Sequence, residues 1–406
     1  MNSAVLAVLL IVFAAIVVLA ALVAVVWRGE IRTMRSLRRV DGNPYLYALD
    51  YRAAYDLDDL VRKNLDTYAG LLNYAVDRLV KLCHPHLSIP MLGDRRGGQT
   101  VNCSSFQAAK ADGNGFLFGR NYDYYENPTL ITFSHPQKGY ASVSVSDMSF
   151  MGYSLQNLPG ASLQSRLNSL IAIYAPLDGM NETGFCASIL ALPAHLASRQ
   201  DTFRDDVGTS ILVRLMLDRC ATVDEAVALL ETVDVRHDVS VGSGFHYMIA
   251  DASGGCAVIE FDPEDGWKTL VIRKPAGKDY MQVTNHMLAP KYSTREPDGA
   301  VGNTGSHSWE RYRKMEEFLG GKDGRLTLEE ALECLNQVRW IDLPVSSGLA
   351  GGTQYQLAFR HFVPRISVLP DKAFENTQYS IVYDQQARTL SLRNWNDYAT
   401  AHTLAL

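Results

Sequence analysis

Apolar residues run without interruption through the start of the chain. Residues 4–27 contain no charged residue, no Gly and no Pro. As a helix with a rise of about 1.5 Å per residue, this segment would extend over about 36 Å, which exceeds the roughly 30 Å of a bilayer core. The pattern predicts a membrane anchor within residues 1–27. A cleaved signal peptide would instead have a basic stretch, a shorter apolar run and a small-residue cleavage site.

Arginines gather directly after this apolar segment, at Arg28, Arg32, Arg35, Arg38 and Arg39. By the positive-inside rule, such a cluster favours the cytoplasmic side of a membrane for everything downstream. A signal anchor whose globular part is exported stays an alternative, because the rule describes a bias in charge rather than a strict requirement.

Residues 28–102 are expected to form a charged juxtamembrane connector and a helical pro-segment. Over residues 55–82, apolar side chains recur every three to four positions, which predicts an amphipathic helix packed against a partner. Residues 93–100, GDRRGGQT, are rich in Gly and charge. We expect them to form an exposed loop that is open to cleavage.

Strand patterns dominate the rest of the chain and flank a helical middle. A predicted hairpin begins at Cys103 and turns at residues 112–115. Further strands are expected over residues 142–150, 183–192, 247–260, 269–274, 378–383 and 389–393. Helices are expected over residues 207–217, 223–232 and 331–338, and Thr222 and Thr327, each with Glu three positions later, indicate capping boxes. Without a visible internal repeat, residues 103–406 are predicted to form one layered domain.

Composition and charge exclude several classes of protein. The 406 residues are 47% hydrophobic and 20% charged, which is typical of globular proteins and not of disordered or collagen-like chains. The formal net charge of −6 at pH 7 provides no positive field for nucleic acid. Six cysteines in this length are too sparse for a disulfide scaffold. Cys83, His84 and His86 lack a second ligand pair, so no metal site is expected.

Several short motifs follow one another in a fixed order. Cys103-Ser104 is followed by GRNYD at residues 119–123 and by LDGMNETG at residues 177–184. Further along the chain stand YMIAD at 247–251, VIE at 258–260, TN at 284–285, WERY at 309–312 and TQYS at 377–380. In this order the motifs resemble the choloylglycine hydrolase and penicillin V acylase family of N-terminal nucleophile hydrolases. Acid ceramidase and N-acylethanolamine acid amidase are more distant relatives.

The resemblance covers nearly all of residues 103–406. It implies an α+β fold, the four-layer αββα sandwich, preceded here by the transmembrane helix and a short helical propeptide-like segment. It also implies hydrolysis of linear non-peptide amides through an acyl-enzyme thioester, without a metal or an organic cofactor. The partner would be a small-molecule amide with an apolar acyl group.

A cysteine nucleophile needs a proton acceptor, because a free thiol with a pKa of about 8.5 is only a few per cent ionised at neutral pH. An α-amino group, with a pKa of about 7.7 to 8.0, can take this proton if it belongs to the nucleophile itself. We therefore expect Cys103 to become an N-terminus by scission after Asn102. The expected route is attack of the Cys103 thiol on the Asn102 carbonyl.

The resemblance implies roles for four further residues. Arg120 would lie against the Cys103 sulfur and favour the thiolate, and Asp123 would orient the freed α-amine. Asn285 and Arg311 would stabilise the charge that develops on the tetrahedral intermediate.

Substrate identity is left open among conjugated bile acids, penicillin V, N-acyl-homoserine lactones, N-acyl amino acids and fatty-acid amides. Ala191 stands where the bile-salt enzymes carry Asn, so a backbone N–H would have to bind the oxyanion there, and bile-salt specificity is in doubt. Tyr122 and Tyr124 would suit an apolar acyl pocket, although tyrosines in a strand also pack within sheets.

Other interpretations of the same residues stay open. Arg120 and Asp123 would also fit a structural ion pair, and Arg311 an ordinary solvated helix position. His246 and His286 allow a papain-like Cys/His arrangement. An acyltransferase of the same fold, or a non-catalytic membrane-tethered domain that binds amides, would carry the same motifs. The oligomeric state is open, a homo-oligomer included.

Overall fold

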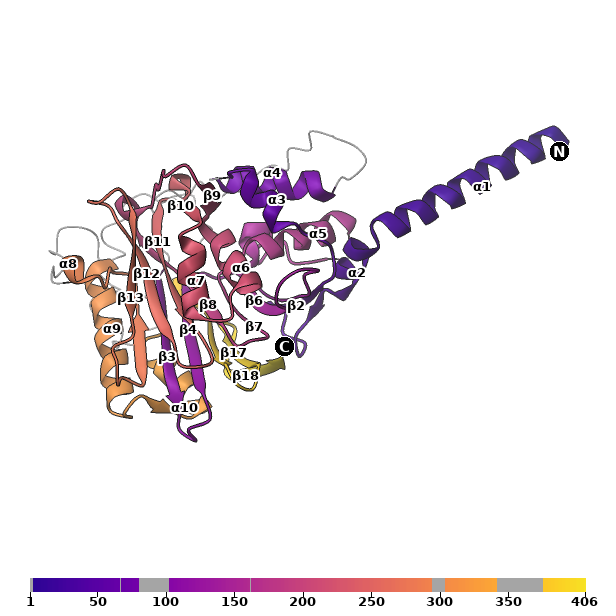
Figure 1. Cartoon of the computed structure of the whole chain (residues 1–406). Coiled ribbons are helices and arrows are strands. Elements are labelled where there is room, and N and C mark those ends of the chain that lie inside the picture. Colours follow the sequence, from indigo (N-terminus) through magenta and orange to yellow (C-terminus); the bar gives the residue numbers. More distant parts are fainter. Residues whose placement is uncertain (1–2, 66, 80–101, 161, 294–303, 342–374) are drawn as a thin grey trace, which may run out of the picture.

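Two stacked β-sheets with helices on their outer faces build the body of the protein (Figure 1). The computed structural model describes residues 3–65, 67–79, 102–160, 162–293, 304–341 and 375–406. Strand β3 of one sheet packs against β8 and β11 of the other, and helices contact the far side of each sheet. The layers therefore run helix, sheet, sheet, helix, which confirms the predicted αββα arrangement.

The larger sheet has nine strands among the described residues, in the order β1-β2-β5-β6-β7-β8-β11-β12-β13. Their bounds are β1 Arg38–Arg39, β2 Leu46–Tyr51, β5 Thr129–Ser134, β6 Ser142–Asp147, β7 Asp178–Asn181, β8 Cys186–Pro193, β11 Ser243–Ala250, β12 Cys256–Asp262 and β13 Lys268–Arg273. Strands β2 and β5 pair in parallel, whereas the other neighbours pair antiparallel. Parallel neighbours cannot be joined by a tight turn, so β2 and β5 belong to distant parts of the chain.

The smaller of the two stacked sheets contains the predicted hairpin. Its order is β14-β3-β4-β16-β17-β18, with β15 paired to β3. The bounds are β3 Asn102–Lys110, β4 Phe116–Tyr125, β14 Tyr280–Val283, β15 Arg325–Leu326, β16 Glu375–Asp384, β17 Thr389–Asn394 and β18 Asp397–Ala405. Cys103 stands at the start of β3, as predicted. A separate parallel pair joins β9 Asp205–Gly208 to β10 Val233–Arg236.

Different helices cover the two sheets. Helices α6 Thr209–Arg219 and α7 Val223–Leu230 pack on the larger sheet, and α9 Thr304–Gly320 and α10 Leu328–Gln337 pack on the smaller one. The short helices α5 Leu163–Asn168 and α8 Pro290–Ser293 lie at the periphery. The capping box at Thr327 is confirmed. Thr222 also caps its helix, but the Glu225 carboxylate accepts from the Ala221 N–H instead of completing the box.

One predicted helix is wrong. Instead of a single helix over residues 55–82, the chain forms α3 Leu57–Arg62 and α4 Tyr68–Leu79, and residues 80–82 lie outside the described ranges. Asn64 has a φ of 51°, a left-handed conformation that ends a helix, and Asn adopts it more readily than most residues. The apolar periodicity continues across this break, which is why it did not reveal the break.

Helix α1, Ser3–Val26, projects away from the rest of the protein (Figure 1). Its residues Val5–Val26 are long and apolar enough to cross a membrane, and none of that stretch is buried within the protein. An N-terminal signal sequence would have the same length and composition.

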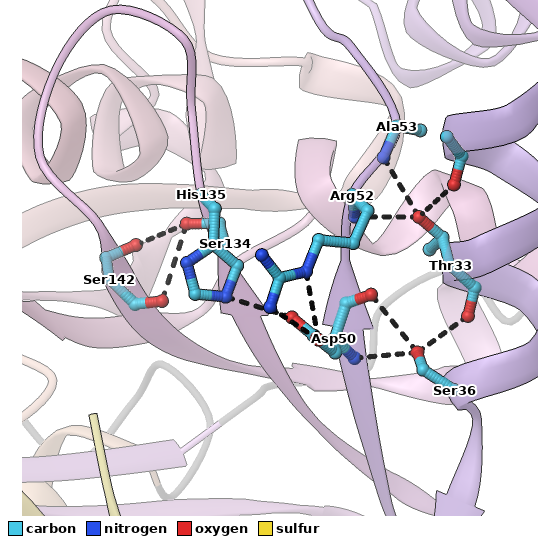
Figure 2. Close-up of polar contacts among 9 residues, drawn as sticks. Thr33, Ser36, Asp50, Arg52, Ala53, Ser134, His135 and Ser142 are labelled. Carbon is cyan, nitrogen blue, oxygen red and sulfur yellow. Dashed lines mark hydrogen bonds and ion pairs between the residues drawn. The ribbon is translucent and has the colours of Figure 1, made fainter.

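Helix α2, Arg28–Ser36, joins α1 to the larger sheet (Figure 2). The Thr33 hydroxyl donates to the Gly29 carbonyl at 2.9 Å and accepts from the backbone N–H groups of Arg52 and Ala53 at 2.8 and 2.9 Å. Ser36 Oγ bonds both the N–H and the carbonyl of Asp50. Strand β2 belongs to the predicted connector, residues 28–102, yet it is a strand of the larger sheet, whose other strands except β1 come from the downstream chain. The domain boundary at residue 103 stays a prediction.

Replacing Thr33 by Val tests the docking of α2. The change keeps the shape of the side chain but leaves a buried N–H group, that of Ala53, and a partly buried one, that of Arg52, without their acceptor. We therefore expect the free energy of unfolding to fall by about 3 kcal/mol. Thr33→Ser is the matched control, because it keeps the hydroxyl and removes one methyl group, at a cost of about 1 kcal/mol. Urea unfolding in detergent measures both. Equal losses would contradict the role of the hydroxyl.

Candidate active site

The β3–β4 hairpin presents two faces that carry different chemistry. Cys103 pairs with Tyr122 and Asn102 pairs with Asp123 across the antiparallel ladder. Cross-strand partners share a face and successive residues alternate. Cys103 and Arg120 therefore face the larger sheet, whereas Asp123 faces the side on which α9 and α10 pack. The start of β3 thus has Cys103 and Arg120 on one face of the hairpin and Asp123 on the other.

A buried arginine lies against the candidate nucleophile. Arg120 is 0% exposed, and its Nη2 lies 3.5 Å from the Cys103 sulfur and donates to the Ile189 carbonyl at 2.8 Å. Nη1 donates to the Leu177 carbonyl and forms an ion pair with Asp178 at 2.8 Å. The guanidinium is thus held between the sulfur and a carboxylate of the opposite sheet.

Two tyrosines complete this buried cluster. Tyr379 and Tyr383, both from β16, donate to the two oxygens of Asp178 at 2.5 Å each. Their hydroxyl groups and Arg120 together satisfy the carboxylate, which would otherwise be too costly to bury as an ion. Asp178 therefore positions Arg120 and does not itself contact the sulfur in the described hydrogen bonds.

Opposing effects act on the Cys103 thiol. Burial raises its pKa above the ordinary value, and the nearby Arg120 partly opposes this by stabilising the thiolate. Because burial dominates, the thiol of the uncut chain is protonated at neutral pH. Nucleophilic attack from this site therefore requires a base that removes the proton.

Asn285 and Arg311 hold the backbone of the candidate nucleophile. Asn285, two residues after the end of β14, accepts from the Cys103 N–H through Oδ1 at 2.8 Å. Arg311, from α9, donates to the Cys103 carbonyl, to Ser104 Oγ at 2.7 Å and to Asn285 Oδ1 at 2.7 Å. Its side chain also lies 3.5 Å from Asn102 Oδ1. Arg311 is only 2% exposed, so it is not a solvated helix residue.

The Asp123 carboxylate is buried, and only one of its two oxygens accepts a hydrogen bond among the described residues. Its Oδ1 accepts from the Thr377 hydroxyl at 2.6 Å, whereas its Oδ2 has no hydrogen-bond partner among the described residues. Burial raises the pKa of this carboxyl to about 6, although Arg311, Thr377 and Arg120 act in the opposite direction. A buried acceptor without a donor is unusual and leaves room for one more hydrogen bond.

The residues predicted to line a substrate pocket are largely enclosed in the uncut chain. Tyr122 is 1% exposed, donates to Asp147 at 3.1 Å and packs against Tyr379 and Tyr124. The carbonyl of Ala191, on β8, accepts from Asn285 Nδ2 at 2.7 Å. Ala191 thus contacts the site through its backbone, and its predicted role and those of the tyrosines stay predictions.

Neither histidine near the motifs contacts Cys103 in the described bonds. His246 is buried with Nδ1 3.3 Å from Glu260 and Nε2 2.8 Å from the Thr284 carbonyl. His286 stacks on Trp309 at a ring separation of 3.9 Å. Their contacts therefore give no support to a papain-like pair. Cys83, His84 and His86, which were considered as metal ligands in the sequence, lie outside the described ranges.

Sequence reasoning missed several supporting residues, although most of them lie within the motifs. Asp178 and Thr377 belong to the LDGMNETG and TQYS motifs but received no role. Ser308 was also missed, and its hydroxyl accepts from the Asn285 N–H at 2.7 Å. No local pattern marks Asp178 as a buried carboxylate, because its strand β7 reads Asp-Gly-Met-Asn, a composition typical of turns.

The comparisons with known proteins give one family-model match over part of the chain and several solved structures of low sequence identity. Residues 172–345 match the family model described as acyl-coenzyme A:6-aminopenicillanic acid acyl-transferase. No curated protein matches the chain significantly. A variant of the conjugated bile acid hydrolase from Clostridium perfringens is 15% identical, and the similarity covers 75% of this chain and 92% of that one with a TM-score of 0.51. This likeness shows a shared fold.

Two further solved structures are more loosely similar. Another variant of the Clostridium perfringens enzyme has a TM-score of 0.49 at 15% identity, over 75% of this chain and 92% of that one. Penicillin V acylase from Agrobacterium tumefaciens has a TM-score of 0.42 at 18% identity, over 74% of this chain and 84% of that one. The family-model match over residues 172–345 and the fold shared at a TM-score of 0.51 agree with the resemblance that the motifs carry.

The raised pKa of Asp123 predicts a pH-dependent stability of the uncut chain. Because the folded chain binds this proton more tightly than the unfolded chain, the contribution is fully present below the ordinary pKa of 3.8 and is lost as the pH rises through about 6. We compare the Cys103→Ala protein with the double variant that also carries Asp123→Asn. Between pH 4 and 7, the free energy of unfolding of the first should fall by up to about 3 kcal/mol relative to that of the second. Urea unfolding over this pH range measures the difference, and a constant difference would contradict the assignment.

Proposed function

We propose that this chain is an amidase that hydrolyses linear C–N amides other than peptide bonds, with the Cys103 thiol as the nucleophile. The observation that carries the proposal is the set of buried groups around one residue. Arg120 lies at the sulfur, Asn285 at the backbone N–H and Arg311 at the carbonyl of Cys103. The similarity to the bile acid hydrolase and penicillin acylase group supports an amidase of this type.

Maturation would begin with an acyl shift. The Cys103 sulfur attacks the Asn102 carbonyl carbon, a C–S bond forms and the C–N bond between the two residues breaks. The proton of the thiol passes to the departing nitrogen, and water then hydrolyses the thioester to release the Asn102 carboxyl group. Arg311, which contacts the Cys103 carbonyl and the Asn102 side chain, would hold the two residues on either side of the reacting bond.

Scission would supply the base that the buried thiol lacks. The new α-amine of Cys103 stands at the former peptide nitrogen, which Asn285 Oδ1 already contacts. Asp123 faces the scission point across the β3–β4 ladder, and its unpaired Oδ2 is a suitable acceptor for an ammonium N–H. Asp123 would thereby orient the amine, and thiol and base would belong to one residue.

The amidase reaction would then follow the same chemistry with a bound substrate. The amine takes the proton of the thiol, and the thiolate attacks the substrate carbonyl to give a tetrahedral intermediate. Donors from Asn285 and Arg311 stabilise its oxyanion. The C–N bond breaks, the proton returns to the leaving amine, and water hydrolyses the acyl thioester on Cys103.

Substrates would be small amides with an apolar acyl group. The ring of Tyr122 lies beside Arg120 and packs against Tyr124, and such an aromatic pair favours an apolar acyl chain over a charged one. The Ala at position 191 argues against bile-salt conjugates as the preferred class.

The exposed α1 would anchor the enzyme in a membrane, so that an amide with a lipid-like acyl chain could reach it from the bilayer. The arginines that follow α1 favour the cytoplasmic side for the catalytic part.

Replacing Cys103 by Ala tests both maturation and catalysis. We expect wild-type protein to yield two fragments with Cys103 as a new N-terminus, and the variant to remain a single chain of 45.0 kDa. Hydrolysis of a panel of N-acyl amides should fall at least about 1000-fold in the variant, because no nucleophile remains. Intact-mass analysis, terminal sequencing and product release measure these outcomes.

The matched control is Cys334→Ala, which removes another buried thiol, on the buried face of α10. This variant should cleave itself and hydrolyse amides as the wild type does. Fully active wild-type protein that consists of one uncut chain would overturn the proposed maturation.

Acyl transfer is a second candidate, because the matching family model is named for an acyltransferase. In that case the thioester on Cys103 would react with an amine instead of water. We expect added amine acceptors to leave the free acid as the main product, as measured by mass spectrometry. An acylated amine that dominates at millimolar acceptor would assign the enzyme to the transferases.

A further inference from the structure

Asn285 lies in a connecting segment and not in a helix or strand. Residues 284–289, which we call the Asn285 loop, follow the end of β14 at Val283 and precede α8, which begins at Pro290. Regular backbone ladders and helical hydrogen bonds therefore do not hold this loop in place. The position of the Asn285 side chain depends instead on side chains of other elements that bind the loop.

A buried pair from the larger sheet binds both ends of the Asn285 loop. His246 of β11 and Glu260 of β12 are each 0% exposed. His246 Nε2 lies 2.8 Å from the carbonyl oxygen of Thr284. The Glu260 carboxylate accepts from the N–H groups of Leu288 and Ala289 at 2.6 and 2.9 Å. One contact thus stands at the start of the loop and two stand at its end.

We propose that His246 and Glu260 are positioning residues that hold Asn285 at the backbone N–H of Cys103, and so set the geometry for scission and hydrolysis. This inference rests on the proposed function and deepens it. In the described hydrogen bonds neither side chain contacts Cys103, so both act only through the Asn285 loop. Glu260 ends the VIE motif and Asn285 ends the TN motif, and the two motifs therefore serve one site.

The two side chains of the pair act as a unit because they share a proton. A carbonyl oxygen only accepts, so Nε2 of His246 carries a hydrogen and donates it to Thr284. Nδ1 of the same ring lies 3.3 Å from Glu260 Oε1, and two acceptors at this contact would repel one another. One further proton therefore lies between Nδ1 and Oε1. It makes the buried pair neutral as a whole and fixes the direction of the ring.

Both ends of the Asn285 amide are used in the orientation that the loop sets. Oδ1 accepts from the Cys103 N–H at 2.8 Å and from Arg311 at 2.7 Å, while Nδ2 donates to the Ala191 carbonyl at 2.7 Å. A displacement of about 1 Å would break hydrogen bonds of this length, and misplacement on that scale costs about 100-fold in rate. The pair can thus affect catalysis without a contact to substrate.

Two substitutions of His246 test the proposal in the full-length protein. His246→Leu removes the donor to the Thr284 carbonyl, whereas His246→Gln carries an amide N–H to about the position of Nε2. We expect kcat for N-acyl amide hydrolysis to fall about 100-fold in His246→Leu, with KM within about two-fold. His246→Gln should lose less than about 10-fold. An unchanged kcat in His246→Leu, equal losses in the two variants, or a change confined to KM would contradict the role.

Glu260→Gln provides a second variant that keeps the size of the side chain. One carboxylate oxygen becomes an NH₂ group, so the backbone N–H of Leu288 or of Ala289 would face a donor. We expect the same pattern as in His246→Leu, a fall in kcat of about 100-fold at nearly constant KM. Wild-type kcat in folded Glu260→Gln would overturn the inference even where His246→Leu does not fold.

The matched control is His237→Leu, the same change at another buried histidine. His237 is 4% exposed and accepts from the Ser198 N–H at 2.9 Å, and it makes no described hydrogen bond to the Asn285 loop. Urea unfolding should show a loss of stability, while kcat stays within about two-fold of wild type. A fall in kcat as large as that in His246→Leu would show that any buried histidine has this effect, and would contradict the specific role.

A last arm does not depend on activity. In the uncut Cys103→Ala protein, hydrogen–deuterium exchange with fragmentation that resolves residue 103 reports on the N–H that Asn285 binds. We expect His246→Leu and Asn285→Ala each to speed this exchange by about 10-fold, and their combination to match Asn285→Ala alone. If wild-type protein is inactive, the proposed function fails, yet this arm still decides whether the pair holds Asn285. Unchanged exchange in His246→Leu would overturn the inference.

Discussion

The buried ion pair between Arg120 and Asp178 is the constraint on which the rest of the structure depends. A guanidinium with no solvent exposure is tolerable only if a carboxylate and carbonyl groups surround it. Arg120 comes from β4 of one sheet and Asp178 from β7 of the other, so the pair fixes how the two sheets face one another. The same guanidinium then lies 3.5 Å from the Cys103 sulfur. One interaction thus stabilises the sandwich and determines the environment of the thiol.

Cys103 is the second residue of β3, and its side chain and its backbone are held by different groups. Its side chain points between the sheets toward Arg120, whereas on the other face Arg311 donates to its carbonyl and Asp123 lies opposite Asn102. A peptide bond at the start of a strand can be held by side chains without breaking the ladder that follows. This arrangement is what the proposed scission would need, because the Cys103 side chain and backbone would both stay held if the bond before Cys103 were cut.

The upstream residues take part in the same architecture. Strand β2 completes the larger sheet beside β5, and Thr33 and Ser36 connect it to the helix that follows the apolar α1. A segment of this kind has a structural role even when it precedes a scission point, because the downstream sheet would otherwise end in an apolar, unpaired edge. In this chain, the larger sheet and its connection to α1 therefore depend on overlapping sets of residues.

Local patterns in the sequence determined the long apolar helix, the hairpin that begins near Cys103 and the cap at Thr327, because each depends on residues within a few positions of one another. The motifs also indicated the residues around the thiol. Only the tertiary structure decided that β2 pairs with β5, that the predicted helix over residues 55–82 is broken near Asn64, and that Asp178 supports Arg120. Pairing between strands some 80 residues apart, and the burial of a charge beside its partner, depend on contacts that no local periodicity encodes.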